Sequence, residues 1–217
     1  MEIKIIIQSD LIKKLRRHKK WLETKDSEQI EGEKADLSFT DLSGMNLSSI
    51  DLRKANLTGA LFRNADVSET NFNEAEMSGV DLSNAKMNQT CLNETDLKNA
   101  NLSGAYMHFT SFIKSNMDGA NLSNSKLGCT NFSEASLQNN NFNNSDFHLP
   151  NLSKTSLQNS SFYQSKMWKP KFNDSNLENA DLRKADIEYP NLSGAILKGI
   201  KLDDTNLKGV DIQSFDI

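Results

Sequence analysis

Residues 35–59 read ADLSF TDLSG MNLSS IDLRK ANLTG, and the spacing of their leucines decides the fold of the chain. An apolar residue recurs at every fifth position from Leu37 to Ile217, which makes 37 positions occupied by Leu, Phe, Met, Val or Ile. The residue two places earlier is usually small, such as Ala55 or Ala60. A period of five fits neither the 3.6-residue repeat of a helix nor the two-residue repeat of a strand. A short fixed period instead predicts a solenoid.

The same period predicts a shape. If each pentad forms one side of a square coil, twenty residues complete one turn, and equivalent residues stack at the strand spacing of ~4.8 Å. The apolar centres then point inward and fill the coil, and the position two places earlier must be small because it also faces inward. Residues 35–217 would make about nine coils and a rod of about 44 Å.

Several pentads match the consensus A-[DN]-L-X-X of the pentapeptide-repeat proteins, a family that the chain resembles throughout residues 35–217. The matching pentads are ADLSF (35–39), ANLTG (55–59), ADVSE (65–69), ANLSG (100–104), ANLSN (120–124) and ADLRK (180–184). The resemblance implies an all-β solenoid, a right-handed quadrilateral β-helix. It implies less about function, because one fold hosts several roles.

Residues 1–34 lack the period and are predicted to form an N-terminal cap on the β-helix of residues 35–217. Ile3 to Ile7 reads as a short strand, and Ser9 or Asp10 is expected to cap a helix that ends near Lys25. Its apolar stripe would be Leu11, Ile12, Leu15, Trp21 and Leu22, and its basic face Lys13, Lys14, Arg16, Arg17, Lys19 and Lys20. The basic face is either simply solvated or contacts an acidic partner, a membrane surface or nucleic acid.

The corners of the coil differ in sequence. At two corners the second residue after the centre is Gly or Asn, as at Gly59 and Asn64, which predicts type II turns with a positive φ. The other two corners carry residues such as Glu74 and Phe109, which disfavour positive φ. These two corners are therefore expected to form turns of another type.

One of these corners carries the most unusual surface in the sequence. Pro150, Pro170 and Pro190 are twenty residues apart and should stack on one edge of the rod. Beside them, a set of aromatic, apolar and imidazole side chains is expected to point outward in a stripe of about 20 Å: Tyr106, His108, Phe109, Cys129, His148, Leu149, Trp168 and Tyr189. Such a patch on a polar rod favours a partner-binding or self-association surface. Local packing of the corner is the alternative interpretation.

Neither a metal site nor an active site is predicted. His108, Cys129 and His148 lie on nearby coils, but no fourth zinc ligand stands out. The aspartates and serines recur in register, which is typical of residues that satisfy the backbone of a repeat. With its interior filled by the centres, the rod has no room for a substrate pocket. We expect neither a cofactor nor an enzymatic activity.

Composition favours a cytoplasmic protein without a membrane span. No apolar run reaches about eighteen residues. The first ten residues, MEIKIIIQSD, have too short an apolar run for a secretory signal. Cys91 and Cys129 should lie about 10 Å apart, which is beyond the reach of a disulfide.

Two functions fit these features. The first is a non-catalytic structural or protein-interaction module with an unidentified protein partner. The second is implied by the resemblance: a DNA mimic that binds DNA gyrase or topoisomerase IV and gives quinolone resistance or toxin immunity. The chain has a net charge of −4 and residues 1–34 carry +2, which leaves −6 for residues 35–217. A duplex of about 44 Å would carry roughly 26 charges. Direct nucleic-acid binding by this negative rod is not expected.

The repeats continue to Ile217, which leaves no room for a second helical cap. Phe215 stands where a small residue is usual, so it is predicted to close the last coil. A homodimer through the C-terminal coil is the alternative, because it would also hide the unpaired backbone edge.

Overall fold

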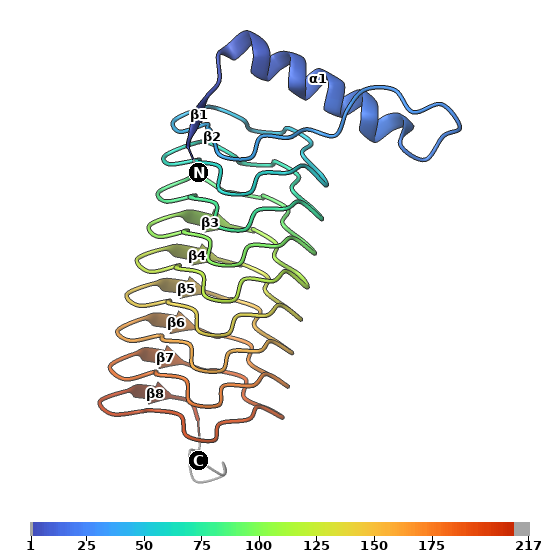
Figure 1. Cartoon of the computed structure of the whole chain (residues 1–217). Helices are drawn as coiled ribbons and strands as arrows, with labels where there is room; N and C mark the ends of the chain where they lie inside the picture. Colours follow the sequence, from blue (N-terminus) through green and yellow to red (C-terminus); the bar gives the residue numbers. More distant parts are fainter. Residues whose placement is uncertain (1, 211–217) are drawn as a thin grey trace.

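The computed structural model describes residues 2–210 and shows a β-solenoid with one helix near its N-terminus (Figure 1). Twenty-residue periodicity decides where its strands occur. The elements are β1 (Lys4–Ile5), α1 (Gln8–Thr24), β2 (Thr40–Asp41), β3 (Tyr106–His108), β4 (Lys126–Gly128), β5 (Asp146–His148), β6 (Lys166–Trp168), β7 (Asp186–Glu188) and β8 (Asn206–Lys208).

Each coil pairs with the next one through the residue that precedes the apolar centre. These bridges are parallel and join residues twenty apart, as in Asp36↔Asn56 at the start and Asp181↔Lys201 near the end. Strands β3 to β8 form a six-stranded parallel sheet in the same register, with Met107 opposite Leu127. The prediction that residues twenty apart stack is therefore confirmed.

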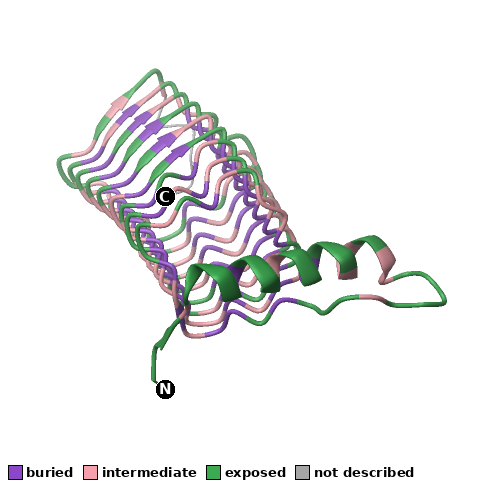
Figure 2. Cartoon of the chain, turned by 90° about the horizontal axis from the view of Figure 1, so that it is seen from above, coloured by how far each residue is buried: buried purple, intermediate pink, exposed green. Residues whose placement is uncertain are grey.

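The apolar centres fill the interior of the solenoid. Every centre from Leu37 to Ile187 is buried, and buried residues line the inside of the coil in the axial view (Figure 2). Phenylalanines twenty residues apart stack face to face, with ring centroids 4.7 Å apart for Phe142 and Phe162. The small residues two places before the centre also face inward, since Ala55 is fully buried. A larger side chain at such a position would compete for this space.

The prediction that two corners avoid positive φ is wrong. The second residue after the centre has a positive φ at all four corners, including Glu74 (60°) and Phe109 (55°). At Glu74 the conformation is held by two backbone hydrogen bonds: Glu74 N donates to Asn93 O over 2.9 Å, and Ala75 N donates to Phe72 O over 2.9 Å. A left-handed conformation costs a non-glycine residue about 1–2 kcal/mol. Pairing with the next coil offsets that cost.

The proline corner differs from the others in its hydrogen bonds rather than in φ. In early coils the turn is closed by a backbone bond, as from Thr70 N to Val67 O over 3.1 Å. From β3 onward, within residues 2–210, the turns at this corner are not closed by a backbone hydrogen bond of this kind. The strands β3–β8 pair with one another at this corner. Proline lacks an N–H. Pro150, Pro170 and Pro190 therefore replace residues whose N–H makes no turn bond.

The N-terminal segment crosses the end of the rod (Figure 1). β1 pairs in parallel with β2, with Lys4 opposite Thr40. Helix α1 begins at Gln8 and Ile7 is its N-cap, without a side-chain hydrogen bond, so the predicted cap at Ser9 or Asp10 is wrong. Among the described residues, no helix combines the length and the apolar composition that a membrane crossing requires. Phe215 and the predicted C-terminal lid or dimer contact lie outside the described residues.

Candidate interaction surface

Two columns of the sheet β3–β8 and the corner column that follows it point outward. The middle column of the sheet, which includes Met107 and Leu127, is buried in the core. The first residues of the strands form the column Tyr106, Lys126, Asp146, Lys166, Asp186 and Asn206, and the third residues form the column His108, Gly128, His148, Trp168, Glu188 and Lys208. The corner column that follows is Phe109, Cys129, Leu149, Lys169 and Tyr189. We call the eight residues singled out in the sequence the aromatic edge: Tyr106, His108, Phe109, Cys129, His148, Leu149, Trp168 and Tyr189.

The aromatic edge is largely exposed. Phe109 keeps 60% of its surface, Tyr106 48%, Tyr189 47% and Leu149 41%. His108 and His148 are also exposed, whereas Cys129 and Trp168 are half-buried. All eight side chains therefore lie along one edge of the rod, within reach of a partner.

Neighbouring rings on this edge contact one another. His148 stacks on Trp168 with ring centroids 4.5 Å apart, and His108 meets Phe109 edge-on at 4.3 Å. These contacts join adjacent coils in the first case and adjacent residues in the second. The rings are consequently held in place before any partner binds.

Lysines interrupt the apolar surface, a feature that the sequence analysis missed. Lys126 Nζ lies 5.2 Å from the centroid of the Tyr106 ring, and Lys169 Nζ lies 4.6 Å from that of Trp168. An ammonium over a ring face is attracted by the negative charge density of the π-system. The edge is thus mixed aromatic and cationic, and the period of twenty was the signal that would have placed these lysines.

Gly128 gives one imidazole its position. A Cβ added at Gly128 would lie 2.8 Å from His108 Nδ1, so the His108 ring occupies the space that a side chain would need. The resulting surface hollow has a volume of about 340 Å³ between β3 and β5 and is lined by Tyr106, His108, Lys126, Gly128, Asp146 and His148. Hollows of this size commonly receive a small ligand or one side chain of a partner.

The structure does not gather His108, Cys129 and His148 into a metal site. Within residues 2–210, no group of three or more His, Cys, Asp or Glu side chains is placed to hold a metal ion. Cys91 and Cys129 are both free thiols.

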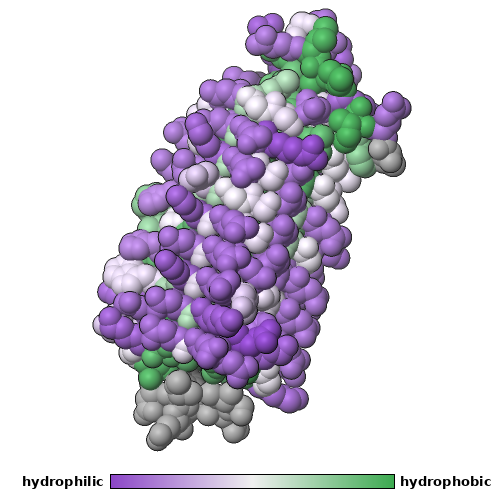
Figure 3. All heavy atoms as spheres, turned by 90° about the vertical axis from the view of Figure 1, so that its left-hand side faces the viewer, coloured by the Kyte–Doolittle hydropathy of each residue, from purple (hydrophilic) through white to green (hydrophobic). Residues whose placement is uncertain are grey.

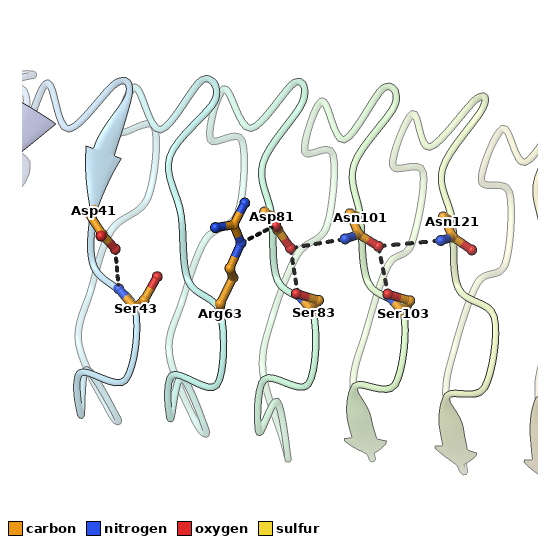
Figure 4. Close-up of polar contacts among 8 residues, drawn as sticks. All are labelled: Asp41, Ser43, Arg63, Asp81, Ser83, Asn101, Ser103 and Asn121. Carbon is orange, nitrogen blue, oxygen red and sulfur yellow. Dashed lines mark hydrogen bonds and ion pairs between the residues drawn. The ribbon is translucent and has the colours of Figure 1, made fainter. Parts of the chain in front are cut away.

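The recurring carboxylates bond to the backbone, as one face of the solenoid illustrates (Figure 4). Asp81 accepts hydrogen bonds from Ser83 N over 3.0 Å, from Arg63 Nε over 2.6 Å and from Asn101 Nδ2 over 3.1 Å. Asn121 continues this ladder along the rod through a bond to Asn101. Partial burial raises the pKa of Asp81, but the bonds from Arg63 and Ser83 outweigh it and hold the pKa below its ordinary value. Asp81 therefore stabilises the repeat as an anion.

Comparison with known proteins shows repeats of the same kind. The sequence description "Pentapeptide repeats (8 copies)" matches residues 33–68, 50–89, 60–99, 90–128 and 115–149, and "Pentapeptide repeat region" matches residues 135–212. No curated protein sequence matches the chain.

A solved structure shares the architecture, and a second one was also found as similar. A trypsin-treated variant of QnrB1, a plasmid-mediated fluoroquinolone resistance protein, is 16% identical, with a TM-score of 0.51 over 81% of this chain and 91% of that one. HetL of Nostoc sp. strain PCC 7120, a pentapeptide repeat protein involved in the regulation of heterocyst differentiation, is 22% identical, with a TM-score of 0.33 over 85% of this chain and 92% of that one. At 16% identity, the likeness to QnrB1 supports the fold and no more.

The matched repeats together extend from residue 33 to residue 212, which is most of the sequence. They coincide with the segment whose coils pair every twenty residues. The chain belongs to the pentapeptide repeat family.

Proposed function

We propose that the chain is a non-catalytic protein-interaction module whose partner docks on the aromatic edge. One observation carries this proposal: Tyr106, Phe109, Leu149 and Tyr189 each expose between 41% and 60% of their surface along one edge of a rod that is otherwise mostly polar. Exposed aromatic side chains that neighbours hold in place are typical anchors of protein interfaces.

Corner packing does not account for these residues. The corner of Lys114, Glu134 and Lys154 has the same positive φ, between 57° and 62°, and carries charged side chains. Lys114 and Glu134 even form an ion pair along the rod, at 4.0 Å. At the proline corner itself, Lys169 occupies the column of Phe109 and Tyr189 with a positive φ of 50°, so the turn does not require an aromatic residue there.

We also propose finer features of the fold and a cellular location. We infer a right-handed, four-sided coil of about nine turns, supported by parallel bridges between residues twenty apart from Asp36 to Lys208. The first bridge between residues twenty apart, at Asp36, supports a division between a cap of residues 1–34 and the β-helix from residue 35. The free thiols of Cys91 and Cys129 support a cytoplasmic location, where thiols stay reduced.

DNA mimicry towards DNA gyrase or topoisomerase IV is the second candidate. Its support is the acidic N-terminal third of the rod: residues 35–100 contain 10 acidic and 5 basic residues. Hydrogen bonds from the side chains and backbone of Ser38, Ser43 and Ser68 lower the pKa values of Asp36, Asp41 and Asp66, respectively. These carboxylates are therefore ionised at neutral pH, as the phosphates of a duplex are.

Photo-crosslinking in cells tests the interaction module. Benzoylphenylalanine in place of Phe109 should give a discrete covalent adduct with one protein, because this side chain is the most exposed aromatic group on the edge. The same label in place of Lys114, on the charged corner, is the matched control and should not give that adduct. Identical adducts from both positions, or none from Phe109, would refute the aromatic edge as a docking surface.

A DNA gyrase supercoiling assay, with and without a fluoroquinolone, separates the two candidates. Mimicry predicts inhibition of supercoiling or protection from the drug. If the aromatic edge contributes, the variant with Ser at Tyr106, Phe109, Leu149 and Trp168 should lose the effect, whereas a variant with Ser at Lys114, Glu134 and Lys154 should keep it. Circular dichroism should show both variants folded. If the native protein neither inhibits supercoiling nor protects gyrase from the drug, the mimicry candidate is rejected. The interaction module is then judged by the crosslinking result alone.

A further inference from the structure

The two flanks of α1 are covered differently. On one flank, residues 25–34 return along the helix: Glu33 N donates to Arg17 O over 3.3 Å, and Thr24 Oγ1 donates to Glu31 O over 3.0 Å. Gly32 lies so close that an added Cβ would be 2.2 Å from Arg17 O. The returning segment therefore covers this flank of the helix between Arg17 and Thr24.

On its other flank, α1 borders an open groove. The groove lies between the helix and residues 49–53 of the first coil and has a volume of about 710 Å³. Apolar side chains of both walls line it: Ile12, Leu15 and Leu22 from the helix and Ile50 from the coil. Ile12 keeps 40% of its surface exposed. One face of the rod is mostly polar in the space-filling view, with apolar side chains at the end that carries the N-terminal segment (Figure 3).

The first coil has an unusual composition at this end. Met45 and Ile50 stand at positions that usually hold small residues, and both are only partly buried. No coil precedes this one, and α1 follows one side of it in the axial view (Figure 2). Large apolar side chains thus fill part of the uncovered end, and the rest forms the groove.

The rim of the groove is basic. Arg16 and Lys19 line it and make no ion pair within residues 2–210. Arg53 on the opposite wall is neutralised by Asp51, to which it donates bonds of 2.9 and 2.7 Å. Glu23 is the other acidic residue of the lining. Because Arg16 and Lys19 lack partners, they would attract acidic groups of a bound molecule.

We propose that this groove binds a short amphipathic α-helix of a partner protein, with apolar side chains on Ile12 and Ile50 and carboxylates on Arg16 and Lys19. The helical wall repeats its contacts at Ile12, Leu15, Lys19 and Leu22, the spacing of one helix face, which suits a second helix laid alongside. The volume lies in the range of sites that enclose ligand side chains. This surface is at the N-terminal end of the rod and is independent of the aromatic edge.

A membrane fits less well than a helix. By helical spacing, Lys13 and Lys20 lie on the side of α1 opposite its buried residues, and both are exposed. A helix that lies in a bilayer interface needs an apolar face to insert. The buried residues of α1, Leu11 and His18, face the rod instead.

Fluorescence anisotropy with a labelled peptide of leucine and glutamate, arranged as an amphipathic helix, tests the proposal. We expect micromolar binding to the full chain, weakened about tenfold by Arg16→Glu with Lys19→Glu. The matched control Lys4→Glu with Lys13→Glu changes the net charge equally outside the groove and should weaken binding less than about threefold. Ile12→Ser, at a partly exposed position, should weaken binding about tenfold without unfolding the helix.

Several outcomes would overturn the proposal. Equal weakening by the two charge reversals would mean that net charge alone attracts the peptide. Binding unaffected by Ile12→Ser would remove the apolar contact. If phosphatidylserine vesicles or duplex DNA bound as tightly as the peptide, with the same response to Arg16→Glu and Lys19→Glu, the site would be a general anion surface. Absence of peptide binding to the native chain would also reject the proposal.

Discussion

His18 is fully buried where α1 meets the first coil. Its Nδ1 accepts a hydrogen bond from Ala35 N over 3.0 Å, and its ring stacks on Trp21 with centroids 5.7 Å apart. Its Nε2 has no hydrogen-bond partner among the described residues. Burial lowers the pKa of His18 below its ordinary value of 6.5, and nearby Asp51 opposes this shift only in part. Nδ1 can accept the Ala35 bond only while the ring is neutral.

The cap should consequently lose stability in mild acid. Because the pKa of His18 is lower in the folded than in the unfolded state, the unfolded chain binds more protons below about pH 6.5. Stability is complete above that pH and decreases as the pH falls towards the lowered pKa. Urea unfolding followed by Trp21 fluorescence, in a Trp168→Phe background, should show this decrease.

His18→Asn is the matched variant for this pH dependence. Its amide oxygen can still accept from Ala35 N, but the side chain does not titrate. The variant should be less stable at every pH. Its free energy of unfolding should change less with pH between about pH 7 and pH 5. An unchanged slope would show that other groups, such as Asp51, cause the acid sensitivity.

The turns of the solenoid differ in whether a backbone hydrogen bond closes them. At the corner of Ala135, the turn is closed by a bond from Ala135 N to Phe132 O over 3.0 Å. At the proline corner, Thr130 N makes no such bond, although Thr130 Oγ1 donates to Met107 O over 3.0 Å. The stack of Pro150, Pro170 and Pro190 follows from this difference.

Proline scanning should therefore distinguish the two corners. Thr130→Pro extends the existing proline column and loses one side-chain hydrogen bond, so we expect a cost of about 0.5–1.5 kcal/mol. Ala135→Pro removes the closing bond and leaves the Phe132 carbonyl unpaired in a buried setting, so we expect a cost of about 2–4 kcal/mol. Chemical denaturation of both variants measures the difference. Equal costs would mean that proline is excluded by ring sterics rather than by hydrogen bonding.

For the whole molecule, each coil contacts only its neighbours, so the ends need protection. At the N-terminal end, Leu11 of α1 is 5% exposed and belongs to the same apolar cluster as Leu37 and Leu42 of the first coil. Lys14 Nζ also donates to Asp36 O over 3.0 Å. The helix thus covers apolar surface and satisfies a free carbonyl at this end of the rod.

Detaching α1 should make the protein self-associate. Leu11→Asp places a charge in the contact between helix and coil, where loss of the leucine alone removes about 1.5–3 kcal/mol of apolar burial. Light scattering should then show oligomers, because the apolar end of the first coil becomes accessible. Lys13→Asp, an exposed control on the same helix, should leave the mass unchanged. A monomeric Leu11→Asp variant with intact coils would show that the cap does not prevent association.

The sequence located the residues of the aromatic edge but not their chemical setting. Steps of twenty residues place His108, His148 and Trp168 on one edge, where the structure has them. The cation over the Tyr106 ring and the imidazole above Gly128 depend on side-chain rotamers that no periodicity encodes. The binding role of this edge stays a prediction.

By itself, the sequence determined the solenoid, because an apolar residue at every fifth position can be buried repeatedly only if the chain coils and stacks on itself. It also determined which positions must be small. Only the tertiary structure decided the conformation of Glu74 and Phe109, since the hydrogen bonds that hold positive φ there come from a neighbouring coil. It likewise decided that His18 is buried and that one flank of α1 is open. Both features depend on how residues 1–34, which lack the period, pack against the end of the rod.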